Sequence, residues 1–412
     1  MFATEPQDTA KIKETAFQSW YKKFSSQPHQ PFFANGIIFF ILFMGLLLGS
    51  YSNVLTLNSA VLDFHAYTMV FVVFIQFFLG FLYVVFPRFL MQAEIEPAVY
   101  MKNFLFYFIC SIGIFLSFLF SLNIHFIFIP LLFVAQILSF RILYSIHKKS
   151  ITQDKNDTKW VLIFFSAGLV THYLFIISLI DFSYAYQVKQ IAINSGFYLF
   201  IFGIIFTISQ RMIPFFTSMK VQGYVINKSK NLMEVLFVLL ILKVFILSFG
   251  TVELNLIADV PLFILFVREL IKWKLPVFKT IAIMWILFIS LYWIPFAFFI
   301  SILESLSAIF DTGIVFEKAV VHTIAVGYFI TVLIGFGTRV VLGHSGQTPH
   351  ADKFAIAIFI TVQFIAFFRI FTSFTPNMNL DYIFFINLSS FLIMAGLIIW
   401  SSRYLTILFK GK

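Results

Sequence analysis

Residues 62–86 read LDFHAYTMVFVVFIQFFLGFLYVVF and contain a single charged side chain, Asp63. A bilayer core about 30 Å thick requires roughly 20 consecutive apolar residues per helix, so this stretch predicts a membrane-spanning helix. Eleven comparable stretches fill most of the remaining chain: 32–51, 103–121, 124–144, 160–180, 190–210, 232–250, 254–271, 277–300, 318–341, 354–374 and 381–409. We therefore expect an all-α fold, a polytopic membrane bundle of about twelve transmembrane helices.

The composition of the chain agrees with this interpretation. Hydrophobic residues make up 61% and charged residues 11% of the 412 positions, so a water-soluble fold would lack the polar side chains to cover its surface. The first 31 residues contain no apolar core of the kind found in a signal peptide. We expect a cytoplasmic N-terminal tail, residues 1–31, followed by a single transmembrane domain, residues 32–409.

The positive charges predict the orientation. Of the 28 Lys and Arg residues, 24 lie in the segments that face the same side as the N-terminus, and only Lys189 and Lys318 lie in the opposite loops. Because positively charged loops resist translocation, both termini are expected in the cytoplasm, in a multi-pass protein of the inner membrane. The net charge of +10 follows from this bias. Its spread over many short segments favours membrane lipid as the partner and argues against nucleic acid.

Arginines recur at equal intervals along the chain. Arg88, Arg211 and Arg339 end the second, sixth and tenth expected spans, with separations of 123 and 128 residues. One interpretation is that inner helix ends attract arginine in general. The other is a repeat of three four-helix arcs, an arrangement that resembles the catalytic subunit of the heme-copper oxidases.

Three further ionisable side chains lie inside expected spans, where each needs a partner. Lys243 and Asp259 are placed at similar depth on neighbouring antiparallel spans, which predicts an architectural ion pair. Arg369 lies near the outer end of its span. Its guanidinium either reaches the outer lipid headgroups or clamps a carboxylate, such as a heme propionate.

The histidines within spans gather in the outer half of the membrane. They are His65, His125, His172 and His322. Neutral imidazole binds heme iron and copper, but a histidine in a bundle also serves as a hydrogen-bonding group between helices. We favour ligation for His65 and His322, leave both roles open for His172, and place His125 at the interface. Met69 follows His65 by one turn, where its thioether either ligates or packs in the core.

Two motifs resemble those of the NnrS family. Residues 319–347, AVVHTIAVGYFITVLIGFGTRVVLGHSGQ, are similar to its tenth-helix signature, and residues 211–217, RMIPFFT, are similar to its arginine–proline–phenylalanine–threonine run. Phe64-His65-Ala66 fits the beginning of its second span. The resemblance extends from about residue 31 to residue 405.

The resemblance implies a heme- and copper-containing protein of twelve spans that is linked to nitric oxide metabolism and to resistance against nitrosative stress. It implies heme and copper as cofactors, nitric oxide as the small ligand and an electron donor that the sequence does not identify. One departure puts copper in doubt, because residues 65–69 read HAYTM where the family usually has HAHEM. The expected site residues are His65, His172, His322 and Arg369 for heme, His65, His322 and Met69 for metal, and Arg211, Arg339 and His344 as further motif positions.

Two other classes of protein remain open at this stage. A proton-coupled secondary transporter would use the outer histidines together with Lys243 and Asp259. A non-catalytic assembly subunit would need neither. Whether the chain is an enzyme is also open, because no other catalytic motif is present.

Overall fold

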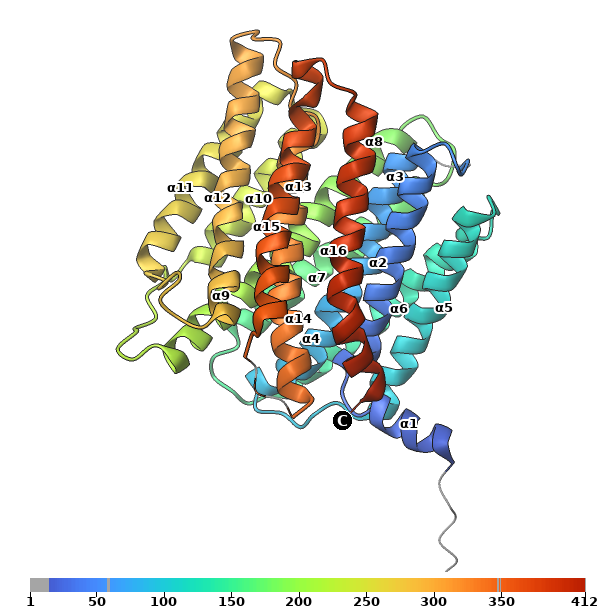
Figure 1. The fold of residues 1–412 in the computed structure, drawn as a ribbon, viewed down its shortest axis with the longest axis vertical. Helices are drawn as coiled ribbons and strands as arrows, with labels where there is room; N and C mark the ends of the chain where they lie inside the picture. The colour runs from blue at the N-terminus through green and yellow to red at the C-terminus, as the bar shows by residue number, and fades with distance from the viewer. Residues whose placement is uncertain (1–14, 58–59, 347, 349, 412) are drawn as a thin grey trace, which may run out of the picture.

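The computed structural model describes residues 15–57, 60–346, 348 and 350–411 and folds them as a bundle of long helices (Figure 1). No strand occurs among these residues. The α-helices are α1 Ala16–Phe24, α2 His29–Tyr51, α3 Val61–Tyr67, α4 Phe74–Phe89, α5 Pro97–Leu119, α6 His125–Lys149, α7 Asn156–Ile177, α8 Ala185–Ser195, α9 Gly203–Lys220, α10 Leu232–Phe249, α11 Leu256–Trp273, α12 Ala282–Ile309, α13 Ala319–His322, α14 Thr331–His344, α15 Lys353–Phe374 and α16 Tyr382–Lys410. Short 3₁₀ turns, η3 Val252–Asn255 and η5 Thr375–Met378, adjoin α11 and α15.

Each expected span corresponds to one rod of the bundle. Three rods consist of two α-helices joined without a break, namely α3 with α4, α8 with α9 and α13 with α14. Eleven rods in the described part of the chain are long and apolar enough to cross a membrane. The remaining expected span, 254–271, is α11, which falls outside that group because it carries several charged residues. The expectation of an all-α polytopic bundle is confirmed.

The two acidic side chains of α11 are buried and contact polar groups of the protein. Near its C-terminal end, the buried Glu269 accepts hydrogen bonds from the Ser229 backbone N–H at 3.1 Å and from Trp273 Nε1 at 3.3 Å. Near its N-terminal end, Asp259 Oδ2 lies 2.8 Å from Lys243 Nζ of α10, and both side chains are almost fully buried. The expected ion pair is therefore confirmed.

The polar surroundings of this pair explain one misplaced boundary. We expected the ninth span to end at residue 300 and a loop to follow over 301–317, but α12 continues to Ile309. Ser301 is buried in that extension, where its hydroxyl donates to Asp259 Oδ2 at 2.5 Å and accepts from Lys243 Nζ at 3.2 Å. Ser301, whose polarity suggests a loop in the sequence, thus forms hydrogen bonds with the buried ion pair between α10 and α11.

The three composite rods share a feature with no counterpart in the other described helices. Each is interrupted by a π-helical segment, η1 Thr68–Val73, η2 Gly196–Phe202 and η4 Thr323–Ile330. These segments begin at residues 68, 196 and 323, at intervals of 128 and 127 residues, which are close to the arginine intervals of 123 and 128 on the same three rods. Since π-helical turns are rare, their recurrence is a second, independent sign of the three-arc repeat.

The first two π segments pack tightly against each other. A Cβ atom placed on Gly196 of η2 would lie 2.9 Å from Val70 Cγ1 of η1, closer than carbon atoms approach. Glycine therefore permits the backbones to meet near the middle of the bundle.

The two ends of the bundle differ in chemistry. The C-terminus lies at the end of the bundle toward which α4, α9 and α14 run (Figure 1). These helices carry Arg88, Arg211 and Arg339, although α9 continues to Lys220 and α14 to His344. We call this end of the bundle the basic end, and the opposite end, where α3 and α13 carry His65 and His322, the histidine end.

The expected N-terminal tail is partly helical. α1 lies at the basic end, where Trp20 Nε1 donates to the Phe409 carbonyl of α16 at 2.8 Å. Its exposed Phe17 and Tyr21, beside Lys22 and Lys23, are typical of a helix that rests in the membrane interface. The first membrane rod, α2, begins at His29, three residues before the expected span.

We expect Lys243→Met to destabilise the protein by about 3–5 kcal/mol, because it leaves the Asp259 carboxylate buried without a cation. The double variant Lys243→Met with Asp259→Leu should recover most of this loss, since replacing both partners removes both buried charges. Thermal unfolding of the detergent-purified protein measures the difference. A double variant no more stable than the single one would show that the two residues are not coupled.

Candidate functional site

The histidine end brings together two histidines that are far apart in sequence. His65 lies in α3, three residues before η1, and His322 is the last residue of α13, directly before η4. Their ring centroids are 6.4 Å apart and their planes differ by 11°. The pairing expected from depth alone is therefore present, and both rings occupy nearly the same place relative to the π segment of their rod.

Arg369 of α15 completes this group. Its Nη2 lies 3.2 Å from Nδ1 and 3.4 Å from Nε2 of His322, and its Nη1 donates to Ser373 Oγ at 3.1 Å. The side chain is buried, with 7% of the residue exposed. None of the ion pairs within the described residues involves Arg369. The guanidinium therefore lies inside the bundle beside an imidazole and does not reach out to the lipid headgroups.

The hydrogen bonds around the two rings define which nitrogens are available. His322 Nδ1 lies 2.9 Å from the Lys318 carbonyl, which can only accept, so Nδ1 carries the proton and the Nε2 lone pair faces the Arg369 Nη2 donor at 3.4 Å. His65 Nδ1 is buried and has no hydrogen-bond partner in the described part of the chain. Unsatisfied polar atoms are costly in an apolar interior, so His65 is incomplete in the protein alone.

His172 occupies a different position, where it is fully hydrogen-bonded. Its Nδ1 lies 2.6 Å from Gln136 Oε1 and its Nε2 lies 3.1 Å from the Tyr67 hydroxyl. With Nδ1 donating to Gln136, the Nε2 lone pair accepts the Tyr67 proton. The ring also stacks on Phe71 at 4.5 Å. This geometry matches the hydrogen-bonding role that was left open for His172.

Met69 is buried as the second residue of η1, one turn beyond His65. Among the described residues, no group of three or more His, Cys, Asp or Glu side chains is arranged to hold a metal ion. The histidine end therefore offers two imidazoles as possible metal ligands, and Met69 lies near His65 in the sequence.

The remaining motif residues gather at the basic end. Arg211 Nη1 pairs with Asp157 Oδ2 at 2.5 Å, and its guanidinium lies 4.0 Å from the centre of the Phe89 ring. Arg339 lies in the same way over Phe216, at 3.9 Å. These two arginines, together with Arg88 and His344, line one large cavity.

Sequence reasoning missed several partners of these residues. His29 was assigned to the tail, but it is buried with its ring 4.7 Å from that of His344. Tyr67 and Gln136 were not expected to hold His172. Depth in the membrane was the only available signal, and it does not show which way a side chain points around its helix.

These features define a polytopic helical membrane protein with a partly buried histidine pair and a buried arginine at one end of its central rods. A family model described as NnrS protein matches residues 23–412, nearly the whole chain. The chain belongs to the NnrS family. A comparison with curated proteins finds no match.

We expect His172→Phe to destabilise the protein by about 1–3 kcal/mol, because it leaves buried polar atoms of Tyr67 and Gln136 without a partner. Thermal unfolding in detergent measures this loss, with His125→Phe at the more exposed start of α6 as the comparison. Equal stability of His172→Phe and the unchanged protein would remove the structural role assigned to this ring.

Proposed function

We propose that this protein binds heme at the histidine end, with His65 and His322 as the candidate iron ligands. His65 retains a buried Nδ1 without a partner in the described part of the chain, and the ring centroids of His65 and His322 lie 6.4 Å apart. His322 carries its lone pair on Nε2, so iron bound at this nitrogen would replace the hydrogen bond from Arg369.

Arg369 is the observation that carries the proposal. A buried guanidinium without a carboxylate partner is unfavourable, and a heme propionate is an anion that such a fork binds bidentately. Tyr51, Tyr382 and Glu317 lie within electrostatic reach of Arg369. Glu317 accepts from the Tyr382 hydroxyl at 3.5 Å but forms no ion pair with Arg369. A ligand role for Met69, and copper as a second cofactor, are parts of the proposal that rest on the family resemblance.

The proposed role is in nitric oxide metabolism or in resistance to nitrosative stress, with nitric oxide as the small ligand. Bound heme would supply an iron centre that takes up nitric oxide and exchanges electrons with a donor. The protein's own residues hold the iron, neutralise the propionate and keep the site within the bundle. Lys243 and Asp259, which suggested a transporter, are held by Asn255 and Ser301 in a closed structural cluster.

We further propose that both termini face the cytoplasm in the inner membrane, because the basic end carries most of the cations. A reporter fused after Lys412 and one inserted at 150–155 should both read as cytoplasmic, while one inserted at 311–313 should read as external. An external signal from 150–155 would contradict this orientation.

Protein purified from heme-supplied cells should show a Soret band typical of histidine-ligated heme. His65→Ala and His322→Ala should each remove or shift this band, because each removes one proposed ligand. Arg369→Gln should lower the heme content roughly tenfold at limiting heme, since one charge-assisted contact contributes about 1.5–3 kcal/mol. Absorbance spectra of the oxidised and reduced protein measure these changes.

His344→Ala is the matched control, because it lies at the basic end and should leave the band unchanged. Addition of nitric oxide to the reduced protein should change the Soret band. An identical band in His65→Ala and His322→Ala would place the ligands elsewhere, and protein that contains no heme after expression with ample supply would refute the proposal.

A further inference from the structure

A large cavity opens at the basic end, remote from the histidine pair. Its volume is about 790 Å³, and it lies where the three composite rods end, between α4, α9 and α14. Two loops contribute to its wall through Asp154 and through Ile226 with Lys228. A cavity of this size can enclose a small organic molecule.

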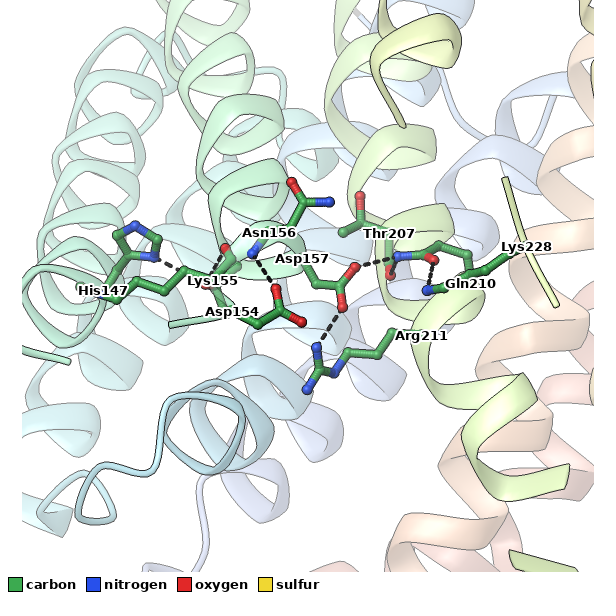
Figure 2. A network of polar contacts seen from close by, with 10 residues as sticks. His147, Asp154, Lys155, Asn156, Asp157, Thr207, Gln210, Arg211 and Lys228 are labelled. Atoms are coloured by element: carbon green, nitrogen blue, oxygen red, sulfur yellow. Dashed lines mark hydrogen bonds and ion pairs between the residues drawn. The ribbon is translucent and has the colours of Figure 1, made fainter. Parts of the chain in front are cut away.

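Most of the charges around the cavity are paired with one another. Asp157 accepts hydrogen bonds from Arg211 at 2.5 Å and from Gln210 at 2.6 Å, and the Gln210 carbonyl accepts from Lys228 at 2.6 Å (Figure 2). Arg88 pairs with Glu94 at 3.0 Å. This network holds Arg211 and Lys228 in place at the wall (Figure 2).

Arg339 is the exception. Its guanidinium lies over a phenylalanine ring as that of Arg211 does, but its buried Nη1 has no hydrogen-bond partner in the described part of the chain. None of the ion pairs among the described residues includes it. The cavity wall thus contains four Lys and Arg side chains against two aspartates, Asp154 and Asp157, and the unsatisfied donor belongs to Arg339.

The rest of the wall is apolar. Phe81 and Phe336 lie at its inner boundary, and Phe89, Phe215 and Phe216 lie beside the arginines. Phe81 and Phe336 also border a smaller apolar space between the same three rods. A fully hydrated inorganic ion would leave this surface unused, whereas a molecule with an apolar body would cover it.

We propose that the basic-end cavity binds an amphiphilic oxyanion, a carboxylate or phosphate attached to an apolar body, with Arg339 as its principal contact. Lys228 and Arg211 complete a cationic wall around the anionic group, and the phenylalanines receive the apolar body. This proposal does not depend on heme at the histidine end. The chemistry is shared by a membrane lipid with a phosphate headgroup and by a soluble organic acid.

The test uses the full chain in detergent, with thermal unfolding followed by tryptophan fluorescence. Octyl phosphate should raise the unfolding temperature with saturation, octanol should not, and inorganic phosphate should act only at much higher concentration. Arg339→Gln should weaken octyl phosphate binding by about tenfold or more, since a charge-assisted contact is lost. Arg403→Gln is the matched control, because this arginine pairs with Asp352 at the same end but does not line the cavity.

Without added ligand, Arg339→Gln should unfold at the same temperature as the unchanged protein or higher, because it removes an unsatisfied buried donor. Lys228→Met provides a second variant, which should weaken octyl phosphate binding severalfold. Competition by phosphatidic acid, but not by phosphatidylcholine, would assign the site to a lipid, and lack of competition would assign it to a soluble acid. Equal affinity for octyl phosphate in the unchanged protein, Arg339→Gln and Lys228→Met, or equal stabilisation by octanol, would overturn the proposal.

Discussion

Lipid provides no water for the polar groups that this chain carries into the bundle, so each must be satisfied by another part of the protein. The structure largely meets this requirement. Lys243 pairs with Asp259, His172 is held by Tyr67 and Gln136, and Asn103 accepts hydrogen bonds from Tyr83 and Ser139. Ten buried side-chain atoms of the described residues have no hydrogen-bond partner, and Asp259 Oδ1 and Gln136 Nε2 are among them. His65 Nδ1 and Arg339 Nη1 are the two that lie at the proposed sites, which is why we assign ligands there.

The π segments lie between the histidines of the histidine end and the arginines of the basic end. One extra residue in a helix rotates everything beyond it by about 100° relative to an uninterrupted α-helix. η1 separates His65 from Arg88, and η4 separates His322 from Arg339. The π segment of each rod therefore sets the angular relation between its histidine and its arginine. Loss of a π turn would rotate one end of the rod away from its partners, which gives a physical reason for its recurrence at 68, 196 and 323.

The sequence predicted the features that any membrane-spanning chain must have, namely the length of its apolar helices and the depth of its polar side chains. Apolar length predicted every rod, and depth predicted that Lys243 would meet Asp259 and that His65 and His322 would lie near the same face of the membrane. Depth does not specify rotation about a helix axis, so the sequence did not reveal that Tyr67 faces His172. The sequence also did not show that Arg211 has an acidic partner and that Arg339 forms no ion pair with the described residues. The partner of Arg211 is Asp157 at the start of α7, and only the fold brings the two together. The residues of η1, TMVFVV, are largely β-branched, a composition that other apolar spans of the chain share, so it does not by itself mark a π turn.

The space between the two ends constrains what can pass from one to the other. It is lined by Phe74, Phe81, Phe329 and Phe336 among other apolar side chains. An oxyanion that left the basic-end cavity for this space would lose its cationic partners and gain no hydrogen bonds, at a cost of many kcal/mol. A small neutral molecule such as nitric oxide faces no such penalty. The two proposed sites thus lie on the same three rods but are separated by a barrier to charge, so an anion at Arg339 would influence the histidine end only through the rods themselves.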